Sequence, residues 1–236
     1  MRMNFSTVSQ RLADAFADRE ALVNIERQRR YTFREYHLLT NRIVNMMRHK
    51  LDLQRGDNAV VILDNDNASL IHWFTAVKAG TALCYTNYRD SLDDHTYQVD
   101  TVNAKVVFIE ADLLKSHYEM LRERQVTIVA MDTPVVIDDR EDVVIMRFTG
   151  GTTGRGKCAM YSADTWLACR DSYWALPDPA WSPETRFIHL APITHGSGMM
   201  FGPTLFKGGC TVTMNVPDLE AWCDNIAAVI PPVGYE

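Results

Sequence analysis

The sequence predicts an α/β fold with mainly parallel sheets flanked by helices, and three observations lead to this prediction. Short apolar runs alternate with segments of helical periodicity between residues 32 and 130, as is typical of parallel strands joined by crossover helices. A glycine- and threonine-rich loop at residues 149–157 directly follows another apolar run. Of the 236 residues, 47% are hydrophobic and 23% are charged, which is the balance of a soluble globular protein.

Local signals mark where the helices of the first half begin and end. Thr32 and Glu35 form a capping box, in which each side chain binds an otherwise unpaired backbone amide. Asn67 is predicted to cap a second helix, which Gly80 ends, and Ser91 opens a third. The elements expected up to residue 130 are, in order, helix 32–51, strand 59–63, helix 67–80, strand 82–85, a helix from 91, strand 105–109, helix 111–124 and strand 126–130.

The aspartate-rich segment 132–142, which contains Pro134, is predicted to be a linker between two halves. It divides the chain into an N-terminal α/β subdomain, residues 1–133, and a second α/β subdomain, residues 134–236, which carries the loop. The elements expected in the second subdomain are strand 143–146, an extended segment 157–161, helix 163–176, strand 187–190, a short helix after residue 198 and strand 211–214.

Composition and spacing exclude several functional classes. The net charge of −6, spread along the chain, argues against a nucleic-acid partner. The N-terminus lacks the features of a signal peptide, and no apolar run approaches the roughly 18 residues that a transmembrane segment needs. The five scattered cysteines fit reduced thiols in a cytoplasmic protein. The seven histidines show no ligand spacing, so no protein-built metal site is expected.

The loop R-F-T-G-G-T-T-G-R-G-K-C, residues 147–158, is predicted to bind phosphate. Glycines let backbone amides approach an anion, while threonine hydroxyls and the Lys157 ammonium add donors. Counted from Gly151, the segment resembles a P-loop that ends in Cys158 where Ser or Thr belongs. A thiol is a poor ligand for Mg²⁺, and the residues after Lys157 look extended rather than helical, so the P-loop interpretation is weak.

Counted from Thr149, the segment T-G-G-T-T-G-R-G-K resembles the signature loop of the adenylate-forming (AMP-binding) enzymes, [Thr/Ser]-[Ser/Gly]-Gly-Thr-Thr-Gly-x-Pro-Lys-Gly. Gly156 replaces the family's proline and Cys158 its final glycine. Segments 31–36, 53–60, 76–80, 191–198 and 205–209 resemble further family motifs in the family's order. The positions that match the signature loop are Thr149, Gly150, Gly151, Thr152, Thr153, Gly154 and Lys157.

The resemblance implies the first part of the large N-terminal domain of acyl-CoA synthetase-like enzymes. Such enzymes are ligases that activate a carboxylic acid with ATP to an acyl-adenylate, release pyrophosphate and form a thioester with CoA. The resemblance also implies that the signature loop binds ATP, that Mg²⁺ is held through the phosphates, and that His195 borders the acyl pocket. By contrast, His189 is expected to be a satisfied core residue. Three tryptophans are expected to serve packing: Trp166, Trp174 and Trp181.

The family's later motifs, including its mobile C-terminal domain, are not visible in the chain. We therefore expect residues 1–236 to be an N-terminal fragment that is inactive alone. The alternative is a truncated non-catalytic relative that binds ATP, AMP or a partner chain. The sequence does not identify the acid, decide between CoA and a carrier protein as the acceptor, or distinguish a homodimer from a monomer.

Overall fold

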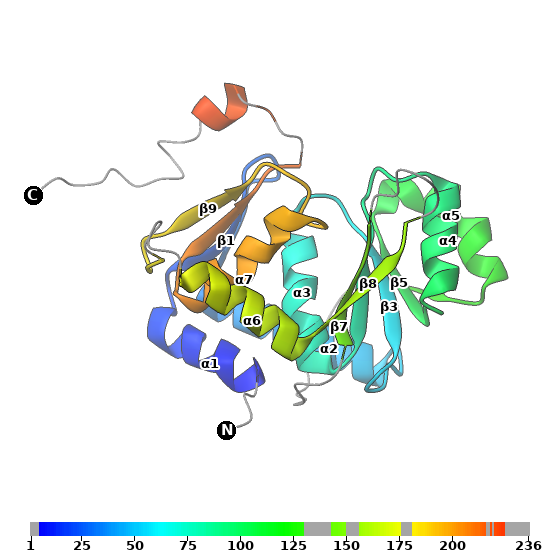
Figure 1. The fold of residues 1–236 in the computed structure, drawn as a ribbon, viewed down its shortest axis with the longest axis horizontal. Helices are drawn as coiled ribbons and strands as arrows, with labels where there is room; N and C mark the ends of the chain where they lie inside the picture. The colour runs from blue at the N-terminus through cyan, green and yellow to red at the C-terminus, as the bar shows by residue number, and fades with distance from the viewer. Residues whose placement is uncertain are drawn as a thin grey trace, which may run out of the picture.

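The computed structural model describes residues 5–129, 143–149, 156–175, 181–215, 218 and 220–224. Two sheets form its framework (Figure 1). The larger has the order β6-β5-β3-β4-β7-β8 and is parallel except for β8. Its strands are β3 (Asn58–Ile62), β4 (Ala82–Tyr85), β5 (Val106–Ile109), β6 (Thr127–Val129), β7 (Val143–Phe148) and β8 (Cys158–Ser162).

The smaller sheet has the order β2-β1-β10-β9, with only β2 antiparallel to its neighbour. Its strands are β1 (Glu20–Asn24), β2 (Arg29–Thr32), β9 (Arg186–His189) and β10 (Cys210–Thr213). The predicted class, mainly parallel sheets flanked by helices, is therefore confirmed. Each sheet takes strands from both sides of residue 133. The linker 132–142 lies outside the described residues, and the division at 133/134 stays a prediction.

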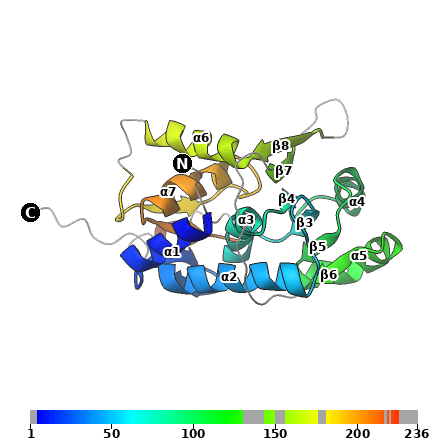
Figure 2. The same ribbon diagram turned by 90° about the horizontal axis from the view of Figure 1, so that it is seen from below.

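Helices fill the space between the sheets and cover the outer face of the larger one (Figures 1 and 2). Helices α2 and α3 lie between the sheets, while α4 and α5 cover the opposite face of the larger sheet. In the described part of the chain, no helix combines the length and apolar character needed to cross a bilayer. The helices are α1 (Phe5–Phe16), α2 (Phe33–His49), α3 (Asn67–Ala79), α4 (Leu92–Thr101), α5 (Ala111–Glu123), α6 (Ala163–Trp174), the 3₁₀ helix η1 (Gly196–Met200) and α7 (Phe201–Phe206).

Strand β3 shows how the apolar runs build two cores. Its side chains alternate between the faces of the sheet. Ala59 and Val61 pack into the core shared with α2 and α3, whereas Val60 and Ile62 pack into the core under α4 and α5. Because both faces are covered, the four buried residues of β3, from Ala59 to Ile62, are all apolar, which is why this run was predicted to be a buried strand.

Helix α1 was not predicted from the sequence. The starts of α2, α4, α5 and α6 were predicted correctly, whereas that of α3 was not. Thr32 and Glu35 form the expected capping box of α2, and Ser91 caps α4. The predicted cap Asn67 is wrong: Asp66 caps α3, and its carboxylate accepts a hydrogen bond from the backbone amide of Asn67. The fully buried Asp66 also pairs with two arginines of the β1–β2 turn region, Arg27 at 2.6 Å and Arg29 at 3.2 Å. These charges lie far from residue 66 in the sequence, so local pattern did not indicate them.

A buried polar network links α1, α2 and α3. The ammonium of Lys78, which is fully buried, donates to Thr40 Oγ1 at 3.0 Å and to Asn41 Oδ1 at 2.5 Å. Asn41 Nδ2 lies 2.8 Å from His37 Nε2, and His37 Nδ1 lies 2.8 Å from Ser9 Oγ. Burial lowers the pKa of Lys78 to about 7. Burial, together with the Lys78 charge, lowers the pKa of His37 to about 4.

Replacing Lys78 with methionine is expected to change the pH dependence of stability. Below about pH 7 the lysine is charged in both the folded and the unfolded state, and the full penalty of its burial is present. Above pH 7 the folded state loses the proton while the unfolded state keeps it, so wild-type stability gains up to about 1.4 kcal/mol per pH unit from this group. Urea unfolding at pH 6–9 should therefore show the stability of Lys78→Met relative to wild type falling as pH rises.

The matched control is Lys115→Met, which removes an exposed lysine from α5. It should leave the difference from wild type constant over this pH range. A constant difference for Lys78→Met as well would contradict the assignment of the titration to Lys78.

Candidate active site

The two ends of the signature loop, Thr149 and Lys157, are hydrogen-bonded to each other at the end of β7. We call this closed base of the loop its neck. The Thr149 amide donates to the Lys157 carbonyl at 2.9 Å, and the Lys157 amide donates to Thr149 Oγ1 at 3.2 Å. The Thr149 hydroxyl is thus used within the neck. The five residues at the tip of the loop, for which we predict phosphate contacts, lie outside the described residues: Gly150, Gly151, Thr152, Thr153 and Gly154.

Gly156 occupies a place where no side chain fits. A Cβ atom built there would lie 2.2 Å from the carbonyl oxygen of Thr149, a distance that requires the backbone to move. Proline also carries a Cβ, so the glycine at the family's proline position has a packing reason in this chain. The Gly156 carbonyl faces α4, where Tyr97 donates to it at 3.5 Å. The neck is therefore closely packed rather than loose.

Replacing Gly156 with alanine is expected to destabilise the protein by about 1–3 kcal/mol, because the added methyl group forces Thr149 and the strand ends apart. Gly196→Ala is the matched control, since a Cβ at that position meets nothing within 4 Å. Thermal unfolding of the two variants measures the difference. Equal melting temperatures would show that the neck does not require a glycine.

The charged side chain of Lys157 lies at the surface beside the loop. Its side chain is exposed, and no carboxylate among the described residues forms an ion pair with it. The antiparallel pairing of β7 with β8 continues to Phe148 and Cys158, which holds the backbone of Lys157 next to Thr149. An exposed ammonium held beside a glycine-rich loop can bind an anionic ligand.

His195 lies at the other sheet, in the turn that follows β9. It is exposed and caps η1, its amide donating to the Pro192 carbonyl at 3.0 Å. Gly198 closes this turn, because a Cβ there would lie 2.1 Å from the Ile193 carbonyl oxygen and 2.9 Å from Trp73 Cζ2. Trp73 in turn stacks on Arg147 of β7, at 4.8 Å from guanidinium carbon to ring centroid. Trp73 therefore joins the strand that carries the loop to the turn that carries His195.

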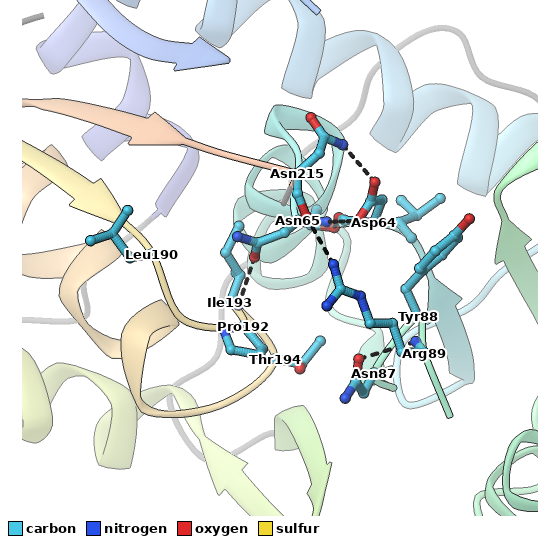
Figure 3. A pocket seen from close by; sticks show the side chains of 12 residues that line it. Asp64, Asn65, Asn87, Tyr88, Arg89, Leu190, Pro192, Ile193, Thr194 and Asn215 are labelled. Carbon is cyan, nitrogen blue, oxygen red and sulfur yellow. Dashed lines mark hydrogen bonds between the residues drawn. The ribbon is translucent and has the colours of Figure 1, made fainter. Parts of the chain in front are cut away.

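A cavity of about 150 Å³ opens where the carboxyl ends of four parallel strands meet (Figure 3). These strands are β3, β4, β9 and β10, two from each sheet. Such crevices are where open α/β sheets bind ligands. Thr194, the neighbour of His195, lies in the wall. The lining residues are Leu63, Asp64, Asn65, Ser69, Asn87, Tyr88, Arg89, Leu190, Pro192, Ile193, Thr194 and Asn215.

Asn65 holds the walls of this cavity together. Its Nδ2 donates to the Met214 carbonyl at 2.8 Å and its Oδ1 accepts from the Ile193 amide at 2.8 Å, so one side chain bridges β10 and the His195 turn. Asn215 donates to Asp64 at 2.6 Å (Figure 3). Sequence reasoning missed these residues. A signal was present, since Asn and Asp directly follow the apolar strand β3, but it did not indicate which partners they reach.

His189 is a core residue, as predicted. It is fully buried, and burial lowers its pKa to about 3. Nδ1 lies 2.8 Å from Ser197 Oγ, whereas Nε2 has no hydrogen-bond partner within the described ranges, so the expectation of full satisfaction holds for one ring nitrogen only.

The three tryptophans pack as expected. Trp166 is 2% exposed. Trp174 Nε1 donates to the Pro203 carbonyl at 3.1 Å, and Trp181 Nε1 donates to the Tyr173 carbonyl at 3.2 Å.

Comparison with known proteins matches this arrangement to one family and fold. The family model described as AMP-binding enzyme matches residues 9–232. Long-chain fatty acid transport protein 6 of Mus musculus is 25% identical over 206 residues, 76% of this chain and 32% of the relative. The medium/long-chain-fatty-acid–CoA ligase FadD8 of Mycobacterium tuberculosis is 28% identical over 154 residues, 65% of this chain and 25% of the relative. The chain thus spans about a third or less of the length of these two relatives.

Solved structures show the same fold. The N-terminal domain of FACL13 from Mycobacterium tuberculosis superposes with a TM-score of 0.82 at 17% identity, covering 96% of this chain and 61% of that one. ATP-bound MatB from Rhodopseudomonas palustris gives a TM-score of 0.80 at 22% identity, covering 96% of this chain and 48% of that one. The fold is therefore that of the N-terminal domains of acyl-CoA synthetase-like enzymes.

Proposed function

The chain belongs to the AMP-binding enzyme family, and on that premise we propose that it forms the nucleotide-binding part of an acid–thiol ligase. The enzyme activates a carboxylic acid with ATP to an acyl-adenylate and then transfers the acyl group to CoA. The observation that carries the proposal is the neck of the loop, in which Thr149 and Lys157 are bonded to each other while the Lys157 side chain stays exposed. This geometry presents one cation at the exit of a parallel strand.

In the first step a carboxylate oxygen of the acid attacks the α-phosphorus of ATP. The bond from the α-phosphorus to the bridging oxygen breaks, and pyrophosphate leaves with the electron pair. Negative charge grows on the leaving group, and a preorganised cation stabilises it. We assign this role to Lys157, with amides and hydroxyls of the loop tip as further donors: Gly150, Gly151, Thr152, Thr153 and Gly154. Thr149 keeps the neck closed.

Mg²⁺ fits this site through the phosphates of ATP. Among the described residues, no group of three His, Cys, Asp or Glu side chains could hold a metal ion, and Mg²⁺ commonly binds through substrate phosphates. When bound, the ion neutralises phosphate charge.

The acid is proposed to lie between the two sheets. His195 is exposed in the turn after β9, and its neighbour Thr194 lines the inter-sheet cavity. An imidazole N–H in this turn can donate a hydrogen bond to the reacting carboxylate. In the second step the thiol sulfur of CoA attacks the acyl carbonyl carbon, and AMP leaves.

ATP–pyrophosphate exchange by the full-length gene product, measured with a panel of carboxylic acids, tests the proposed function. We expect exchange that depends on one class of acid. No exchange with any acid, under conditions where a related ligase is active, would contradict the proposal. ATP binding without exchange would instead support the non-catalytic alternative.

A further inference from the structure

Arg147 is a nearly buried cation that lacks a counter-charge in the described part of the chain. It lies on β7, in the run V-V-I-M-R-F, and is 7% exposed. Its Nε and Nη2 atoms have no hydrogen-bond partner among the residues that the structure describes. Its guanidinium carbon lies over two aromatic rings, 4.8 Å from the centroid of Trp73 and 5.8 Å from that of Tyr161.

No carboxylate among the described residues pairs with Arg147. The titratable groups that face it are Tyr85, Tyr161 and Cys169. Burial raises the pKa of Tyr85 and of Cys169, so both stay neutral near pH 7. A buried charge without a partner is costly, because neither water nor an opposite charge compensates it. Stacking on Trp73 recovers only part of this cost.

The two unpartnered atoms of Arg147 lie on one edge of the guanidinium. Nε–H and Nη2–H point in parallel along that edge, and together they match the two oxygens of a carboxylate. Both donors are buried and without a partner, while the remaining nitrogen is not among the buried unpaired atoms. The vacant donor pair therefore fits a planar oxyanion better than a single hydroxyl or a water molecule.

Arg147 lies between the loop and the His195 turn. On a strand, residues two apart share a face and are roughly 7 Å apart, so Arg147 and Thr149 lie on the same side of β7. Trp73 contacts both Arg147 and the turn at Gly198. Helix α3, which carries Trp73, runs between the two sheets (Figure 1). This face of β7 thus points into the space between the two sheets, where the proposed function places the acid.

We propose that Arg147 determines substrate specificity by binding a second carboxylate of the acid, distal to the one that is adenylated, so that the preferred substrate is a dicarboxylic acid. The inference rests on the proposed function. The distal carboxylate is favoured over the reacting one because the reacting carboxylate loses its charge when it forms the mixed anhydride with the α-phosphate. A buried guanidinium bound to that group would stabilise the ground state more than the transition state. A distal carboxylate keeps its charge throughout.

Kinetics with matched acids test this inference in the full-length gene product. Pairs of equal chain length, such as glutarate with pentanoate and adipate with hexanoate, are compared by kcat/KM in the exchange assay. Wild type should prefer the dicarboxylate of a pair. Arg147→Met should lower kcat/KM for that dicarboxylate by about 10²-fold, since a buried carboxylate loses its partner, and should change the value for the monocarboxylate little.

Arg170→Met is the matched control. Arg170 also stacks on aromatic rings, at 4.6 Å from the centroid of Trp174, but it already pairs with Asp171 at 2.6 Å. The Arg170→Met variant should leave the preference for the dicarboxylate unchanged. Equal use of both acids by wild type, or an equal loss for both acids in Arg147→Met, would overturn the inference. No exchange with any acid would count against the proposed function instead.

Binding without catalysis gives an independent measurement. The preferred dicarboxylate alone, without ATP, should raise the melting temperature of wild type because it binds only the folded state. It should not raise that of Arg147→Met, and the monocarboxylate should raise neither. Should Arg147→Met fail to fold, Arg147→Lys, which keeps the charge but loses the paired donors, takes its place. Equal stabilisation of wild type by both acids would overturn the inference.

Discussion

Replacing Lys157 with methionine is expected to lower the rate of ATP–pyrophosphate exchange by about 10²–10³-fold, the loss typical when one preorganised donor to developing negative charge is removed. Methionine keeps the length and the apolar part of the side chain. The neck itself is held by the backbone of residue 157 and by Thr149, so the variant should fold. The variant should lower kcat more than it raises the KM for the acid, because the ammonium stabilises the leaving pyrophosphate.

Lys115→Met is the control, since it removes an exposed lysine of α5 without touching the loop. It should exchange at the wild-type rate. An unchanged rate in Lys157→Met, with its folding verified by circular dichroism, would remove Lys157 from the proposed mechanism.

Replacing Trp73 with alanine is expected to destabilise the protein by about 3–5 kcal/mol, because the cavity left by a fully buried indole cannot collapse completely. Trp73 contacts Tyr85, Trp166 and Phe201, with ring centroids 5.3, 6.3 and 6.4 Å away. It also contacts Arg147 and the turn at Gly198. The variant should therefore weaken both the core and the connection between the two halves of the site.

Tyr118→Ala is the comparison, because Tyr118 is an aromatic residue that is 48% exposed. Its effect should be within about 0.5 kcal/mol, as for most surface substitutions. Urea unfolding of both variants measures the difference. Similar small effects would mean that Trp73 is not a principal packing residue of the inter-sheet core.

Most helices and buried strands could be predicted because their signals are local. A capping box such as Thr32–Glu35 involves residues one helical turn apart, and a strand covered on both faces, such as β3, is apolar at each of its buried positions. The strand β2, R-R-Y-T, carries no such signal. It is a strand because β1 lies beside it, and β1 in turn pairs with β10, almost 190 residues away. Neither β2 nor its neighbour β1 was predicted from the sequence.

The family resemblance located the loop and His195, but the geometry of the site depends on tertiary contacts. The signature loop was readable from glycines, threonines and a lysine in consecutive positions. The environment of Arg147 could not be predicted, because Arg147 lies on strand β7 and its stacking partner Trp73 lies on helix α3. The inter-sheet cavity could not be predicted from the sequence either, because it forms where strand ends from two sheets meet.

The order of residues alone thus established the mainly parallel α/β class, the starts of helices α2, α4, α5 and α6, and the family to which the chain belongs. Each of these depends on contacts within one turn, strand or loop. Folding in three dimensions decided which strands share a sheet, why position 156 is glycine, and that the guanidinium of Arg147 is buried with no carboxylate from the described residues beside it. Each of these depends on atoms that come together from distant segments of the chain or from the two ends of a loop. The sequence around one residue does not indicate which distant residue it contacts.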